Sequence, residues 1–140
     1  MSLLLLFKSE PYISLYNSAT QWDKQGHHKE AIILAQISLE LISERAFNKI
    51  IDSITPNSLQ DWLRKSLEDN HNIANEKVRK LYEALSGNLI SQESFWSRLQ
   101  EHNTLRNDVV HSGKIVTSSQ AAASLRVVKE VKDYFEQKHF

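Results

Sequence analysis

The stretch AIILAQISLELI, residues 31–42, is apolar almost all the way round when it is laid on a helix. A helix without a polar face is expected to run through the centre of a helical bundle. Residues 30–54 continue the helical pattern, which predicts one long, buried helix. Glu40 interrupts its apolar row, with Ile33 seven residues before it and Phe47 seven residues after it. A carboxylate in that position needs a partner of opposite charge.

Further segments have the spacing of helices that would pack around this one. Apolar residues from Pro11 to a natural stop at Gly26 predict a first helix, and those from Ser91 to Gly113 predict a long later helix. A final helix follows Thr117, which opens a capping-box pattern. Residues 57–87 hold two shorter amphipathic segments, which we interpret as an inserted helical hairpin that caps the bundle, forms a lid or offers a partner surface.

The predicted fold class is therefore all-α, a helical bundle with up-and-down topology and five or six helices, because no convincing strand pair or repeat appears. The 140 residues suit a single domain, 1–140. Residues 1–10 are interpreted as a leucine-rich arm, because they lack the basic region and cleavage site of a signal peptide. No stretch approaches the length of a membrane span, so no membrane partner is expected.

The composition limits the kinds of binding and catalysis that the chain can carry out. Lys plus Arg and Asp plus Glu are both 17, so no overall field attracts nucleic acid and any RNA contact must be local. The chain has no cysteine, which excludes disulfides and thiolate chemistry and fits the cytoplasm. His27 and His28 are adjacent and would diverge on a helix without a third ligand, so neither a metal nor a cofactor is expected.

Residues 105–113, LRNDVVHSG, carry the candidate site. On a helix Arg106 lies within roughly 20° of Phe95 and Leu99, inside the apolar stripe. A guanidinium there must find a partner or line a cavity, and Glu40 is the matching misplaced charge, so we expect these two residues to form an ion pair. His111 lies about 140° from Arg106 on an ideal helix. It directly precedes the cap at Gly113, where unwinding could bring the two side chains together.

An arginine, a polar residue and a histidine in this spacing resemble the Arg-x(4–6)-His motif of the HEPN superfamily. Arg106, Asn107 and His111 match it residue by residue. The resemblance implies an all-α bundle, a metal-independent endoribonuclease active on single-stranded RNA and not on DNA, and a homodimer with a composite site. Arg106 and His111 would be catalytic, with Asn107 and, as the acidic residue of the core helix, Glu40 in support.

Members of this family include toxin and phage-defence ribonucleases, which implies an antitoxin or effector protein as a partner. Gly113 stands where toxins of one class have a modified tyrosine, so that mode of regulation is not expected. An alternative is a non-catalytic HEPN module that binds nucleotide, RNA or a protein partner. A third interpretation is a structural interaction domain, in which Arg106 and Glu40 form a buried pair and His111 satisfies a helix-end carbonyl.

Other polar or aromatic groups have simpler interpretations. Lys77, Arg79 and Lys80 form a small basic cluster that is expected to be a solvated face, although it is the best local candidate for phosphate contacts. The three tryptophans each fall on an apolar face and are predicted to lie in the core; these are Trp22, Trp62 and Trp96.

Overall fold

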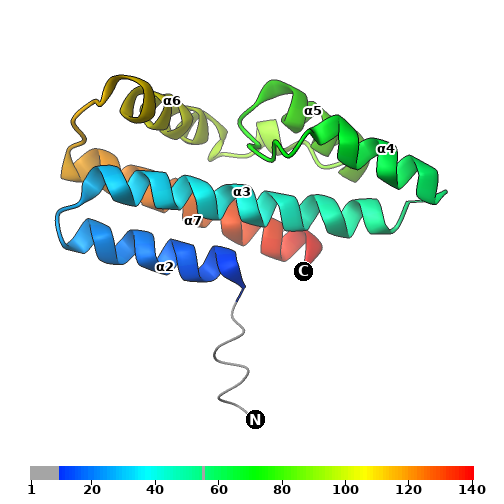
Figure 1. The fold of residues 1–140 in the computed structure, drawn as a ribbon, viewed down its shortest axis with the longest axis horizontal. Coiled ribbons are helices and arrows are strands. Elements are labelled where there is room, and N and C mark those ends of the chain that lie inside the picture. The colour runs from blue at the N-terminus through cyan, green and yellow to red at the C-terminus, as the bar shows by residue number, and fades with distance from the viewer. Residues whose placement is uncertain (1–9, 55) are drawn as a thin grey trace, which may run out of the picture.

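A computed structural model describes residues 10–54 and 56–140, and this part of the chain is built of helices without strands (Figure 1). The predicted all-α bundle is confirmed, with six α-helices in the described residues. Apart from Glu10, the predicted N-terminal arm lies outside them. The helices are α2 (Pro11–Lys24), α3 (His28–Asp52), α4 (Asn57–Leu67), α5 (Glu76–Ser86), α6 (Trp96–Ser112) and α7 (Ser118–His139), with a short 3-10 helix, η1 (Ile90–Gln92).

The long helix α3 is the centre of two layers. It packs with α2 and α7 in one layer, and α6, α5 and α4 lie along its other side (Figure 1). Its buried residues include Ile32, Leu39 and Phe47, as the apolar stretch predicts. One side of α3 stays open, however, because Ile37 is 43% exposed. Among the described helices, none combines the length and apolar character needed to cross a membrane.

The segment before α6 differs from the prediction. The long later helix was expected to begin at Ser91, whereas α6 begins at Trp96 and η1 comes first. Ser91 donates hydrogen bonds from its backbone N–H and its hydroxyl to Glu83 Oε2, at 3.0 and 2.7 Å. These bonds fix the chain to α5, so the helix starts only after the buried Phe95.

Helix α4 of the inserted pair buries less of its apolar face than its pattern suggests. Leu63 and Leu67 are buried, but Leu59 is exposed and Trp62 is 62% exposed. Trp22 is exposed as well, and Trp96 is half-buried, so the prediction of three core tryptophans is wrong for the first two. An amphipathic pattern identifies the side that faces the core, but it does not fix how far a short outer helix sinks into it.

The last helix follows the prediction closely. Thr117 Oγ1 accepts a hydrogen bond from the Gln120 N–H, and Gln120 Oε1 accepts one from the Thr117 N–H, which completes the capping box. The inward face of α7 is buried as expected from its spacing. Gly113 ends α6 at φ +64, a left-handed conformation that favours glycine.

Candidate functional site

Arg106 lies half-buried on α6, and its Nε atom is closed to solvent without a hydrogen-bond partner in the described part of the chain. No carboxylate within residues 10–54 and 56–140 lies in ion-pair distance of its guanidinium. A buried guanidinium nitrogen without a partner is costly, because the group has lost its water. The two terminal nitrogens of Arg106 likewise make no hydrogen bond or ion pair with a described residue, and they are not among the atoms closed to solvent. They are available to an incoming anion.

The predicted ion pair between Glu40 and Arg106 does not form. Glu40 Oε2 instead accepts a hydrogen bond of 2.8 Å from Gln36 Nε2, one turn earlier on α3. The polar residue of α6 that reaches α3 at this level is His102, one turn before Arg106. The partner of Glu40 is thus the side-chain amide of Gln36, whose carbonyl oxygen is in turn hydrogen-bonded to the buried ring of His102.

His102 is the residue that the sequence interpretation missed. It is 2% exposed and bridges two helices: its Nε2 lies 2.9 Å from Gln36 Oε1 on α3, and its Nδ1 lies 2.8 Å from Ser124 Oγ on α7. The available signal was its place on α6, three residues after Leu99 and four before Arg106, which puts it in the same inward stripe.

The network fixes the proton on His102. The carboxylate of Glu40 takes the NH2 group of Gln36, so the carbonyl oxygen of Gln36 faces the ring and His102 Nε2 must donate to it. Nδ1 then accepts from the hydroxyl of Ser124. Burial, and secondly the nearby charge of Arg106, lower the pKa of His102 to about 4. The ring is therefore neutral at physiological pH.

The side chain of His111 is exposed in the last turn of α6, and Asn107 is half-buried. Because α6 remains helical through Ser112, His111 and Arg106 keep about 140° of separation and do not converge in one protomer. The expectation that the helix unwinds before Gly113 is wrong. The side chain of His111 is exposed, while that of Arg106 is half-buried.

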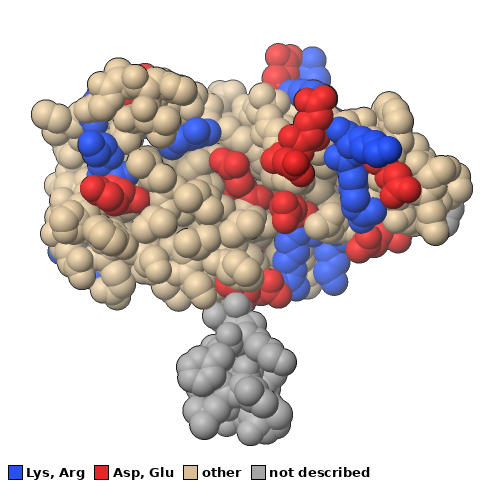
Figure 2. Space-filling view, viewed as in Figure 1, with Lys and Arg blue, Asp and Glu red and all other residues tan. Residues whose placement is uncertain are grey.

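The surface beside Arg106 is partly apolar. Val110, one turn further on α6, is 51% exposed. Asn72 Nδ2 donates to Asn103 Oδ1 at 3.0 Å, which ties the loop before α5 to the preceding turn of α6. Figure 2 shows few charges over α6, while both signs gather over α4, α5 and the second half of α3.

The basic cluster on α5 is largely neutralised. Arg79 Nη1 lies 2.7 Å from Glu83 Oε1, and Lys80 Nζ lies 2.8 Å from Glu76 Oε1. Of this cluster only Lys77 makes no ion pair with a described residue. The cluster is a solvated face, as expected, and it offers little net charge for phosphates.

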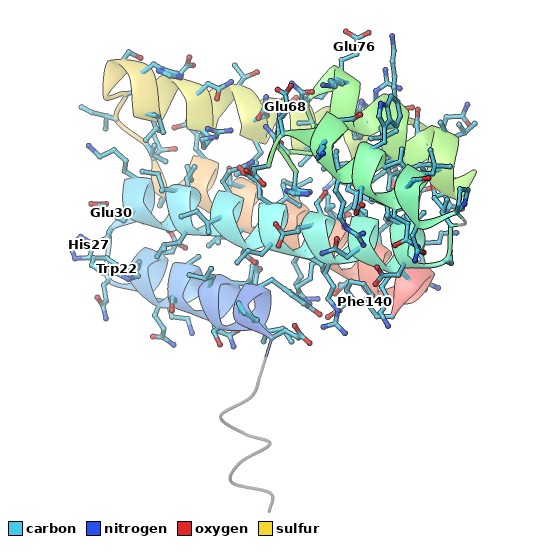
Figure 3. All side chains as sticks on the ribbon, turned by 45° about the vertical axis from the view of Figure 1, so that its right-hand side comes forward. Trp22, His27, Glu30, Glu68, Glu76 and Phe140 are labelled. Carbon is cyan, nitrogen blue, oxygen red and sulfur yellow. The ribbon has the colours of Figure 1, made fainter. Side chains whose placement is uncertain are left out.

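The adjacent histidines are also accounted for by local contacts. His28 Nδ1 lies 2.6 Å from Asp23 Oδ1, and the ring of His27 packs edge-on against Trp22 at the end of the molecule that carries Glu30 (Figure 3). The described residues hold no group of three His, Asp or Glu side chains that could bind a metal ion. Metal ligands were not expected at these positions.

A cleft of about 570 Å³ lies between α6 and α7, on the side of α6 away from Val110. His102 and Ser124 contribute to its floor, whereas Arg106 and His111 do not line it. The hydrogen-bonded chain from Ser124 through His102 and Gln36 to Glu40 therefore runs from this cleft to α3.

Comparisons with protein-family models, curated proteins and solved structures find no match to the chain. The resemblance to the HEPN superfamily thus rests on Arg106, Asn107 and His111 at the end of one helix of an all-α bundle.

Proposed function

We propose that this protein is a metal-independent endoribonuclease of HEPN type, acting on single-stranded RNA as a homodimer. The observation that carries the proposal is Arg106: it belongs to the Arg-x4-His spacing, its Nε is buried, and no described carboxylate neutralises it. A structural buried arginine would be paired. An arginine that binds a phosphate needs the paired N–H groups at the end of its guanidinium, its planar fork, free to donate to two phosphate oxygens.

The reaction is a transesterification. The 2′-oxygen attacks phosphorus, the bond from phosphorus to the 5′-oxygen breaks, and the products are a 2′,3′-cyclic phosphate and a 5′-hydroxyl. A base accepts the 2′-hydroxyl proton, and an acid gives a proton to the leaving 5′-oxygen. His111 suits this work because its side chain is exposed, and Arg106 suits the charge on phosphorus.

His102 is not a substitute for His111. Its two ring nitrogens are already hydrogen-bonded to Gln36 and Ser124, and its lowered pKa keeps it neutral. It can neither reach an RNA strand nor serve as an acid near pH 7. His102 instead holds α6 against α3 and α7, which sets the position of Arg106 one turn later.

Two copies are required because one chain supplies a single suitable histidine. A two-fold dimer places two His111 and two Arg106 side chains in one cleft, so that one histidine acts as base and the other as acid. The half-exposed Val110, one turn after Arg106 on α6, supplies apolar surface on the face that such a dimer would bury. A dimer of the 16.2-kDa chain would be seen by light scattering as twice that mass.

The test is cleavage of a labelled single-stranded RNA in EDTA, followed by analysis of the product ends. We expect cleavage without divalent cations, a cyclic phosphate on the 5′ product, and no cleavage when the scissile position carries 2′-O-methyl or deoxyribose. Cleavage of the DNA strand, or a requirement for a metal, would contradict the proposal.

The alternative is a non-catalytic module that binds a nucleotide, RNA or a protein partner. The cleft between α6 and α7 favours a binding role, since it has the volume of a small-molecule site. Saturable RNA binding without any cleavage would select this alternative.

A further inference from the structure

The cleft between α6 and α7 has a charged rim and a neutral floor. Three cationic side chains line it, and they come from α6, the loop after it and α7: Arg98, Lys114 and Arg126. Two carboxylates, Glu101 and Asp108, line it as well. Figures 1 and 3 show α6 on the side of α3 and α7 away from α2, so α2 does not cover the space between α6 and α7.

Of the three cations on the rim, Arg126 is the one without an ion-pair partner among the described residues. Arg98 forms a bidentate pair with Glu130, and Lys114 Nζ lies 3.8 Å from Asp108 Oδ2. Arg126 makes neither a hydrogen bond nor an ion pair with any residue that the structure describes. It lies four residues before Glu130 on α7, so the pKa of that carboxyl is lowered first by its hydrogen bond to Arg98 and also by the charges of Arg98 and Arg126.

Glu130 is thus paired with Arg98, and the guanidinium of Arg126 has no carboxylate in ion-pair distance within the described residues. Arg126 brings a charge and a planar fork that no protein group in the described chain uses. A phosphate monoester matches this fork, because the two terminal nitrogens of Arg126 can donate to two of its oxygens.

The rest of the lining suits hydroxyl groups. Glu101 makes no hydrogen bond or ion pair within the described residues, and Gln100 and Gln120 add amides to the walls. On the floor, Ser124 gives its proton to His102, so its oxygen still has a lone pair to accept from a ligand. Among the described residues that line the cleft there is no Phe, Tyr or Trp on which a nucleobase could stack.

We propose that the cleft between α6 and α7 binds a sugar phosphate, with Arg126 on the phosphate and Glu101 and Ser124 on the sugar hydroxyls. The volume of about 570 Å³ is within the range of small-molecule sites, about 300–1,000 Å³. This site is separate from Arg106 and His111, so the proposal does not depend on ribonuclease activity.

The buried ring of His102 supplies a built-in reporter, because Ser124 touches both the ligand site and His102 Nδ1. The experiment is a titration of the full chain with glucose 6-phosphate, followed by the ring nitrogen resonances of His102. We expect a saturable shift with glucose 6-phosphate, no saturation with glucose, and weaker binding of inorganic phosphate, since it lacks the hydroxyls.

The decisive variant is Arg126→Gln, with Lys77→Gln as a matched control that also removes one exposed, unpaired cation, on α5. Arg126→Gln should weaken glucose 6-phosphate binding at least tenfold, and Lys77→Gln should bind as the wild type does. The proposal is overturned by an absence of saturable shifts, by equal binding of glucose, or by equal losses in both variants. Circular dichroism of both variants shows that the bundle is intact.

Discussion

The buried ring of His102 should make the protein lose stability in mild acid, and His102→Gln should remove this loss. The unfolded chain takes up a proton on this histidine near pH 6.5, whereas the folded chain does so only near pH 4. The difference, at about 1.4 kcal/mol for each tenfold change in proton affinity, amounts to about 3 kcal/mol. The bundle therefore favours the neutral ring by that amount.

The sign follows from which state binds more protons. The folded-state pKa is depressed, so between pH 6.5 and 4 the unfolded state holds the extra proton and the free energy of unfolding falls as pH falls. The contribution is complete above pH 6.5 and is lost by pH 4. Between pH 7 and pH 5, His102 alone should remove about 2 kcal/mol.

The assay is urea unfolding of wild type and His102→Gln at pH 7 and pH 5. Gln can still donate to Gln36 Oε1 but does not titrate, so the drop between the two pH values should be smaller by about 2 kcal/mol in the variant. His139, whose pKa is also lowered by burial, is present in both proteins and cancels. The control is His111→Gln, the same replacement at an exposed side chain, which should change stability at pH 7 by less than about 0.5 kcal/mol.

Equal pH dependence in wild type and His102→Gln would refute the reasoning, since the ring would then titrate alike in the folded and unfolded states. A His102 ring titration near pH 6.5 in the folded protein, followed by NMR, would refute it independently.

The remaining predictions concern single contacts of the bundle. Glu40→Ala should lower the free energy of unfolding in urea by about 1–3 kcal/mol, because Gln36 loses a charged acceptor, and Glu40→Gln should lower it less. A loss of about 3–5 kcal/mol with Glu40→Ala would instead indicate an ion pair between Glu40 and Arg106. Thr117→Ala should cost about 1 kcal/mol, because it removes the cap of α7, while Ser119→Ala in the same first turn should be nearly neutral. No change with Thr117→Ala would mean that the capping box does not stabilise α7.

The all-α fold could be predicted from sequence because its strongest signals are local. The apolar stretch in α3, the capping box at Thr117 and the glycine at the end of α6 each depend on neighbouring residues. The start of α6 could not be predicted, since it depends on Glu83 reaching Ser91 from another helix. The exposure of Trp62 depends likewise on how α4 settles against α3.

The place of Arg106 and His111 at the end of a helix could be predicted from the sequence, but the hydrogen-bond partners around them could not. Spacing alone places Arg106 and His111 at the end of a helix. That His102, rather than Arg106, reaches the Gln36–Glu40 pair depends on contacts 66 residues apart. Opposite charges on two apolar stripes suggested a direct ion pair, but a neutral amide and ring fill the space at that level.

The most direct test of the central claim compares RNA cleavage by wild type, His111→Ala, Arg106→Lys and His102→Gln under the same metal-free conditions. The account predicts that His111→Ala loses about 10²–10⁴-fold in rate while its circular dichroism stays that of wild type. Arg106→Lys, which keeps the charge and loses the fork, should also be badly impaired. His102→Gln can still donate to Gln36 Oε1, the contact that holds α6 against α3 and positions Arg106, so it should keep most of its activity at pH 7. Full activity of folded His111→Ala would contradict the claim that this histidine moves the protons.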